Sequence, residues 1–312
     1  MLEVQHLRKE YRNLTAVKDL SFRLEQGDIF GFIGPNGAGK TTTIKILATL
    51  LRPTAGRATI DGMDVVRDPE AVRGIIGYMP DFFGVYDDIK VWEYLDFFAA
   101  AYKIPRAKRP GIIDDVLELT DLSIRKEAYV EELSRGMKQR LCLAKTLIHD
   151  PKVLLLDEPA SGLDPRARIE IKELLKELKS MGKTIIISSH ILPELADFCN
   201  KIGIIEQGEL VVSGEVQAIM QQVSGARVYE LKVAEDPDGA AGMLEARPDV
   251  RGVKPAGAPW VGALKIDYIG DPGEIHQLLR DLLVAGFKVQ SFSEQETDLE
   301  DIFMKVTRGA VQ

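Results

Sequence analysis

Gly34-Pro35-Asn36-Gly37-Ala38-Gly39-Lys40-Thr41 follows a short apolar run, 28–33, and precedes an apolar helical pattern around Ile44 and Leu47. The stretch fits G-x-x-x-x-G-K-[ST] in its expected context, between a strand and a helix. Glycines let successive backbone N–H groups turn inward around phosphate oxygens, and the following helix N-terminus adds positive potential. The alternative, a Gly-rich turn with a surface lysine, does not explain the whole pattern. The stretch therefore predicts a loop that holds a nucleoside triphosphate.

A second element supplies two carboxylates after a buried strand. Leu154-Leu155-Leu156 is followed directly by Asp157 and Glu158. In a triphosphate site, Lys40 would reach the β and γ phosphates, and Thr41 and Asp157 would hold Mg²⁺. Glu158 would orient or deprotonate the attacking water. A solvated acidic turn is the alternative reading of these two acids, and the phosphate loop makes it the weaker one.

The order of patterns up to about residue 220 is typical of a layered α/β domain. Strands are predicted at 28–33, 152–156 and 184–187. A helix is predicted from the apolar spacing of residues 171, 174, 175 and 178, with Asp164-Pro165 as its start and Gly182 as its end.

The last part of the chain has a different pattern. A polar break at 221–227 predicts a domain boundary, so that the domains are 1–220 and 227–312. Tyr229, Leu231 and Val233 alternate as in a strand, and so do residues 264, 266 and 268. Residues 275, 278, 279, 282 and Leu283 are predicted to share one helix face. The order βαββαβ predicts a small α+β ferredoxin-like domain, with a final helix over residues 299–306.

Composition excludes several classes of protein. The 312 residues hold 40 Lys plus Arg against 48 Asp plus Glu, a net charge of −8, so no basic nucleic-acid footprint is present and no nucleic-acid partner is expected. The longest apolar run, 97–102, is far shorter than the ~20 residues of a membrane-spanning helix. No export signal is expected at the N-terminus. The two cysteines, Cys142 and Cys199, form no Cys-x-x-Cys, which favours a reducing compartment.

Three further segments identify the kind of nucleotide-binding protein. Leu133-Ser134-Arg135-Gly136-Met137-Lys138-Gln139-Arg140, Ser161-Gly162-Leu163-Asp164 and Ser188-Ser189-His190 occur in this order. Together with the phosphate loop they resemble the signature, D-loop and switch histidine of the ATP-binding cassette (ABC) superfamily over residues 1 to about 220. The fold that this implies is an ABC-type nucleotide-binding domain with a helical subdomain. Taken singly, Ser134 and Asp164 are also good helix caps, and a lone His190 is most often structural.

The resemblance implies ATP with Mg²⁺ and a head-to-tail dimer. Ser134 and Gly136 of one copy would touch the γ-phosphate held by Lys40 of the other, and His190 would contact the same phosphate. Tyr11 would stack on adenine, the alternative being an ordinary half-buried tyrosine. The residues expected to bind the nucleotide are Tyr11, Gly34, Pro35, Asn36, Gly37, Ala38, Gly39, Lys40, Thr41, Thr42, Ser134 and Gly136. Glu158 and His190 are the expected catalytic residues, and Thr41, Asp157 and Asp81 the expected metal ligands.

Two positions depart from the family pattern. Asp81 stands where the family usually has a glutamine, and an extra carboxylate there would favour Mg²⁺ but repel phosphate. We expect Asp81 to tighten the Mg²⁺ dependence; the alternative is a side chain that points to solvent. Arg135 replaces the first glycine of the signature. A surface position is expected for it, with a contact across the dimer as the alternative.

The resemblance also implies a mechanical role with a membrane-spanning permease subunit. The residues of the phosphate loop and the ending Thr297-Asp298-Leu299-Glu300-Asp301-Ile302-Phe303 resemble those of type-2 ABC exporters. A peripheral position on the cytoplasmic face of the cell membrane is expected, as is a homodimer. Phe82, Phe83 and Tyr86 are predicted to help form the groove for the permease, whereas Trp92, Leu95 and Phe98 have the spacing of helix core. An importer ATPase with a regulatory C-terminal domain, or a non-transport ABC ATPase, are the alternatives.

Overall fold

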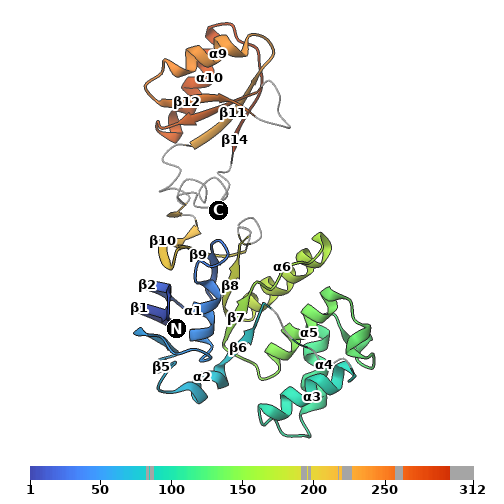
Figure 1. The fold of residues 1–312 in the computed structure, drawn as a ribbon. Coiled ribbons are helices and arrows are strands. Elements are labelled where there is room, and N and C mark those ends of the chain that lie inside the picture. Colours follow the sequence, from blue (N-terminus) through green and yellow to red (C-terminus); the bar gives the residue numbers. More distant parts are fainter. Residues whose placement is uncertain are drawn as a thin grey trace. The chain divides into compact units, whose positions relative to one another are not determined.

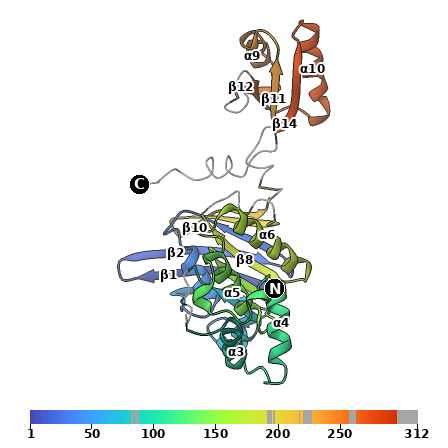
Figure 2. The same ribbon diagram turned by 90° about the vertical axis from the view of Figure 1, so that its right-hand side faces the viewer.

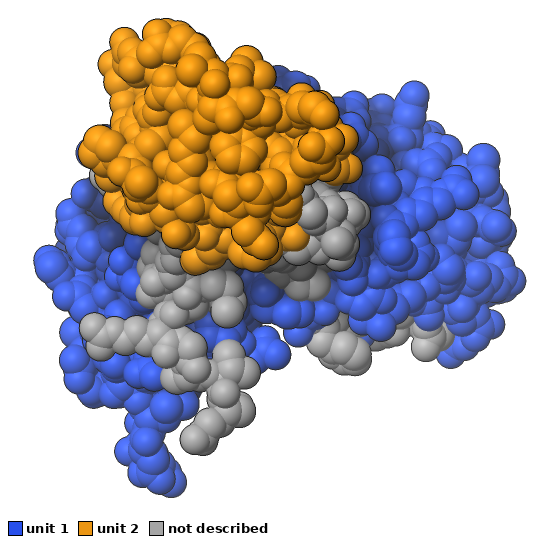
Figure 3. Space-filling model, turned by 90° about the horizontal axis from the view of Figure 1, so that it is seen from above, with its two compact units in different colours: residues 1–216 blue, residues 217–312 orange. Residues whose placement is uncertain are grey.

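The structure is a computed structural model that describes residues 1–81, 84, 88–190, 195, 198–216, 218–219, 227–256 and 263–295. It has two compact units, Met1–Val216 and Gln217–Gln312 (Figure 3). The polar break predicted as the boundary, 221–227, lies slightly further along the chain. None of the helices in the described ranges has the length and hydropathy needed to cross a bilayer.

Unit 1 contains most of the secondary structure. Its strands are β1 Leu2–Tyr11, β2 Leu14–Leu24, β3 Ile29–Ile33, β4 Ala55–Ile60, β5 Met63–Asp64, β6 Ile76–Met79, β7 Val153–Asp157, β8 Thr184–Ser189, β9 Lys201–Glu206 and β10 Glu209–Glu215. Its helices are α1 Lys40–Leu47, α2 Pro69–Ile75, α3 Val91–Ala101, α4 Arg109–Leu119, α5 Arg135–Leu147 and α6 Pro165–Ser180, with 3₁₀ turns at Ser123–Arg125 and Val130–Glu132.

The strands of unit 1 form one mixed sheet in the order β5-β4-β1-β2-β10-β9-β3-β8-β7-β6. Strands β9, β3, β8, β7 and β6 are parallel neighbours, so their carboxyl ends meet at one edge of the sheet. Strands β1, β2, β4 and β5 are antiparallel, and Figure 2 shows the long β1–β2 hairpin reaching out from one side of the unit. The parallel edge is where ligands bind in open α/β sheets.

The predicted elements around the phosphate loop are confirmed. Strands β3, β7 and β8 coincide with the predicted segments to within one or two residues. Helix α6 begins after Asp164, whose side chain accepts a hydrogen bond from the Ala167 amide at 2.9 Å, and it is followed by Gly182 at φ +79°. The buried residues of α6 are the four that the periodicity indicated, 171, 174, 175 and 178.

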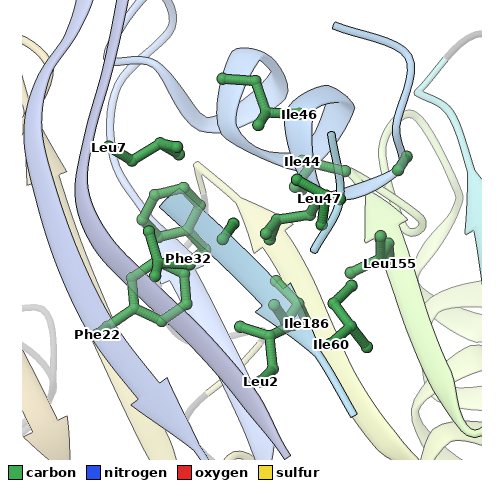
Figure 4. Packing of buried hydrophobic residues seen from close by; sticks show 14 of the residues in the cluster. Leu2, Leu7, Phe22, Phe32, Ile44, Ile46, Leu47, Ile60, Leu155 and Ile186 are labelled. Carbon is green, nitrogen blue, oxygen red and sulfur yellow. The ribbon is translucent and has the colours of Figure 1, made fainter. Parts of the chain in front are cut away.

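The main core holds α1 against the sheet (Figure 4). Ile44, Ile46 and Leu47 of α1 are fully buried in one cluster with strand residues of both the parallel and the antiparallel part, among them Leu155 of β7 and Leu2 of β1. Burial of each such side chain contributes about 1.5–3 kcal/mol to the free energy of unfolding. The position of α1, and with it the loop that precedes α1, is therefore fixed by packing on the sheet.

Helices α3, α4 and α5 pack on one another to one side of the sheet, as the expected helical subdomain (Figure 1). Leu95 is fully buried there, whereas Trp92 and Phe98 are half-buried. The aromatic residues predicted for the permease groove, Phe82, Phe83 and Tyr86, lie outside the described residues.

Unit 2 has the predicted ferredoxin-like topology. Its elements are β11 Arg227–Val233, α9 Pro237–Glu245, β12 Val250–Pro255, β13 Ala263–Tyr268, a 3₁₀ turn Pro272–Glu274, α10 Ile275–Val284 and β14 Val289–Gln295. The antiparallel sheet has the order β12-β13-β11-β14, which is that of a split βαβ sandwich. The predicted helix over 299–306 lies outside the described residues.

The prediction for one residue of α10, Leu283, was wrong. Leu278 and Leu282 are buried, but Leu283, predicted on the same face, is 59% exposed. Successive helical residues turn by about 100°, so Leu283 lies about 140° from Leu278 around the helix axis. It therefore points away from the sheet.

Candidate nucleotide site

The phosphate loop packs so closely on neighbouring backbone that only glycine fits at two positions. A Cβ at Gly34 would lie 2.3 Å from the Ile205 carbonyl oxygen. A Cβ at Gly39 would lie 2.5 Å from the Ala16 carbonyl oxygen, and Gly39 has φ +109° in the left-handed region. Strands β2 and β9 thus shape the loop that joins β3 to α1.

Lys40 lies at the centre of this loop. Its side chain is 6% exposed, and Nζ donates to the carbonyl oxygens of Gly34, at 2.6 Å, and Pro35, at 3.2 Å. Nζ also lies 3.5 Å from Oε1 of Glu158. Burial lowers the pKa of Lys40 below its ordinary value, and the charge of Glu158 opposes this shift. The ammonium group is thereby held where the loop would place phosphate oxygens.

Asp157 meets the loop from the end of β7. Its Oδ1 accepts hydrogen bonds from Thr41 Oγ1 at 3.2 Å and from Ser188 Oγ at 2.6 Å. Its other oxygen, Oδ2, is buried, and within the described residues nothing donates a hydrogen bond to it. A buried carboxylate oxygen without a partner is costly unless it has a ligand, and a cation is the natural one.

Glu158 turns in another direction. It has φ +51°, an uncommon conformation for a residue other than glycine, and its amide donates to Ser188 Oγ at 2.9 Å. Its side chain is 11% exposed, and Oε2 is 2.8 Å from Nδ1 of His190. Since an ionised carboxylate can only accept, His190 donates this hydrogen bond through Nδ1–H. The two adjacent carboxylates therefore have different partners: Thr41 and Ser188 for Asp157, and His190 and Lys40 for Glu158.

The donor set fits Mg²⁺. The Thr41 hydroxyl and the free oxygen of Asp157 are hard ligands beside the phosphate loop. Across the described ranges, no group of three or more His, Cys, Asp or Glu side chains is arranged to hold a metal ion. In nucleotide sites Mg²⁺ is usually held by one or two protein groups together with substrate phosphates.

Asp81 lies after β6 at the same edge. β6 is the parallel neighbour of β7, with Met79 opposite Leu156. Asp81 is exposed, and its charge acts on both Lys40 and Tyr78. Burial, with Asp157 and Asp81, raises the pKa of Tyr78 to about 12. Asp81 thus contributes negative potential to the site from a solvated position.

Tyr11 is the last residue of β1. It is 45% exposed, and Lys9 Nζ lies 5.2 Å from the centroid of its ring. The described structure gives no contact that tests adenine stacking, which stays a prediction.

The signature segment belongs to a separate hollow on the same chain. Ser134 caps α5 by accepting from the Met137 amide at 3.3 Å, and Gly136 is half-buried. With Arg135 they line a hollow of about 220 Å³ whose other wall is the D-loop, Gly162 and Asp164. Within the described residues, no hydrogen bond links 134–136 to the phosphate loop.

Two contributors were missed by sequence reasoning. Ser188 holds both Asp157 and the amide of Glu158, and Gln139 donates through Nε2 to the Pro159 carbonyl oxygen at 2.6 Å. The contact of Ser188 could have been predicted, because Ser188 lies at the end of a strand that neighbours β7. Nothing local pointed to Gln139, because its partner is 20 residues further along the chain.

Comparison with known proteins agrees with this geometry. The profile described as ABC transporter matches residues 17–161. A Nod factor export ATP-binding protein I from Paraburkholderia xenovorans is 33% identical over 311 residues, which cover 100% of this chain and 98% of that protein. The chain belongs to the ABC transporter ATP-binding proteins. It is therefore an ATPase and the ATP-binding subunit of an ABC transporter.

Other ABC transporter proteins resemble all or part of the chain. The linearmycin resistance ATP-binding protein LnrL of Bacillus subtilis is 31% identical, with 98% of each chain covered. The C-terminal domain of DrrA1-3-like ATP-binding proteins matches residues 214–307. A solved ATP-binding subunit of an ABC transporter shares 31% identity over 71% of this chain and 92% of its own, with a TM-score of 0.65. A dimeric bacterial ABC transporter cassette shares 25% identity over 69% of this chain and 99% of its own, with a TM-score of 0.63.

Proposed function

We propose that this ABC ATPase works as a head-to-tail homodimer. In this dimer Ser134 and Gly136 of one copy complete the triphosphate site at Lys40 of the other. The observation that carries the proposal is the separation of the two halves on one chain: the signature segment faces its own hollow, with no hydrogen bond to the phosphate loop in the described part. A helix start with backbone N–H groups and a hydroxyl can stabilise charge on a transferring phosphoryl group only if it reaches that group. The resemblance to a dimeric cassette supports this arrangement.

Each residue of the half-site then has a defined task. Lys40 binds the β and γ phosphates, and the loop amides of 34–41, with Thr42 at the start of α1, hold the remaining oxygens. Thr41 and Asp157, with Asp81 nearby, are the groups that would hold Mg²⁺, which neutralises phosphate charge when bound. Glu158 orients the water and takes its proton, and His190 fixes the Glu158 carboxylate from the end of β8.

A mixing experiment tests the dimer. Lys40→Ala damages the loop side, and Ser134→Arg damages the signature side. In a mixed head-to-tail dimer both lesions fall in one site, which leaves the other site intact, so mixing two inactive variants should restore ATPase activity. The control is Lys40→Ala mixed with Glu158→Gln: each mixed dimer then carries one lesion per site, and no activity should return. Absence of recovery in the first mixture, with both variants folded, would contradict the proposal.

We propose further that the dimer powers export through a separate membrane-spanning permease, bound peripherally at the cytoplasmic face of the membrane. The support is the names of the relatives, which describe Nod factor export and linearmycin resistance, and the DrrA1-3-like C-terminal domain. A tagged chain should copurify with a polytopic protein from detergent-solubilised membranes. Recovery of the chain only from the soluble fraction, without such a protein, would contradict the proposal.

A further inference from the structure

Two side chains of α5 hold the backbone of the D-loop. Arg135 Nη2 donates to the Ser161 carbonyl oxygen at 3.3 Å, and Gln139 Nε2 donates to the Pro159 carbonyl oxygen at 2.6 Å. The two residues are four apart on a helix and therefore lie on the same face. They contact successive parts of one short segment, which joins Glu158 to the start of α6.

The contact of Arg135 is close. A Cβ at Gly162 would lie 2.1 Å from Arg135 Nη2, so the guanidinium covers the position that any other side chain would take. A Cβ at Gly136 would also approach Ala167 Cβ at 3.3 Å, which shows that the start of α5 and the start of α6 are in near contact. The signature segment and the D-loop therefore form one packed unit.

Among the described residues, Arg135 forms no ion pair. Arg140, Arg166 and Glu170 line the same hollow, and both arginines are paired: Arg140 with Asp121 and Glu170, and Arg166 with Glu170. For Arg135, the described residues provide the Ser161 carbonyl as its hydrogen-bond partner and no carboxylate. A guanidinium bound to a backbone carbonyl holds the main chain rather than balancing a surface charge.

Glu158 is the residue whose position depends on the hydrogen bonds from Arg135 and Gln139 to the D-loop. It directly precedes the held segment, and its positive φ leaves the chain a narrow range of directions. A displacement of the start of α5 would therefore be transmitted through Ser161 and Pro159 to the Glu158 backbone. A carboxylate that positions water loses efficiency when it is displaced by even about 1 Å.

We propose that Arg135 is a positioning residue that couples the signature segment to Glu158 of the same chain. This proposal rests on the head-to-tail dimer proposed above. Nucleotide bound by the partner at 134–136 then acts, through Arg135 and the D-loop, on the hydrolysis site of the chain that holds Arg135. The two ATP sites of the dimer are coupled by this contact, and ATP hydrolysis is cooperative.

The grip itself is tested on the nucleotide-free chain, without reference to a dimer. Arg135→Ala should raise amide hydrogen exchange in a peptide covering 159–164, because the Ser161 carbonyl loses its donor. Arg166→Ala is the matched control: it removes the same charge from the same hollow, but Arg166 pairs on its own helix. Equal exchange in wild type and Arg135→Ala would overturn the proposal.

Steady-state kinetics test the coupling. Arg135→Ala should lower kcat about tenfold, the scale of one charge-assisted hydrogen bond, and should move the Hill coefficient for ATP towards one. The affinity of the monomer for nucleotide should stay unchanged, and Arg135→Lys should recover part of kcat. Wild-type kcat and cooperativity in Arg135→Ala would overturn the inference.

The mixing experiment keeps the two proposals apart. It uses chains that all carry Arg135, so its failure would count against the dimer alone. Successful mixing together with wild-type kinetics in Arg135→Ala would count against Arg135 alone.

Discussion

Nδ1 of His190 lies 2.8 Å from Oε2 of Glu158, between the ends of the adjacent parallel strands β8 and β7. The contact joins residues 32 apart in sequence and aims the carboxylate that we propose as the base. On the other side, Oε1 of Glu158 faces the Lys40 ammonium at 3.5 Å. The base is thus held between two cationic or donor groups, and its geometry depends on both.

Glu158→Gln should bind ATP and slow hydrolysis by about 10²–10⁴, because the amide keeps the shape but cannot accept the proton of water. His190→Ala should reduce kcat less, and the double variant should be no slower than Glu158→Gln alone, since His190 acts on that carboxylate. Single-turnover hydrolysis and nucleotide titration measure both quantities. Wild-type turnover in Glu158→Gln would show that the base has been misassigned.

Asp81→Gln should raise the Mg²⁺ concentration that gives half-maximal ATPase activity. The expected factor is about fivefold, equivalent to the ~1 kcal/mol of a solvated charge pair at close range. Metal titrations of the two proteins give the comparison, and Asp88→Asn is a control because Asp88 is an exposed acid further along the same segment. Overlapping titration curves for Asp81→Gln and wild type would refute a role for Asp81 in metal binding.

Tyr11→Ala should weaken ATP binding about tenfold, because stacking of an aromatic side chain on a base contributes about 1–3 kcal/mol. Tyr11→Phe keeps the ring and should bind like wild type. The affinity for inorganic triphosphate, which has no base, should be the same in all three proteins. A loss of triphosphate affinity in Tyr11→Ala would mean that the residue shapes the loop rather than the adenine site.

Asp28→Asn should destabilise unit 1 by about 1–3 kcal/mol at neutral pH. Asp28 accepts hydrogen bonds from Asn200 at 2.8 Å and Lys201 at 2.7 Å, and so joins β3 to the start of β9. Burial raises the pKa of Asp28, but the bonds from Lys201 and Asn200 outweigh it and place the pKa below its ordinary value of 3.8.

The sign of the pH dependence follows. A lowered pKa in the folded state gives a stabilisation that is present above pH 3.8 and is lost as the pH falls further. Urea unfolding at several pH values should therefore show a difference between wild type and Asp28→Asn that shrinks in acid. A difference that grows below pH 3.8 would contradict the assignment.

Local patterns predicted much of the fold. The phosphate loop, the three strands around it and helix α6 depend on glycine, proline and apolar spacing within short windows, where sequence carries the information. The exposed Leu283 shows the limit of such patterns. Leu283 is apolar and directly follows buried Leu282, but it lies about 140° from Leu278 around the helix axis, outside the face that the sheet covers.

Within the candidate site, the sequence by itself determined the chemical groups: a glycine loop with Lys40, two acids after a strand, and a histidine after another. Which of these side chains contact one another was decided by the tertiary structure alone. Ser188 binds Asp157 because β8 is the parallel neighbour of β7, and Arg135 rests on Gly162 because α5 and α6 begin side by side. Spacing along the chain determines which side chains one helix or strand presents. Contacts between distant elements depend on how their apolar faces pack, and no short window of residues encodes that packing.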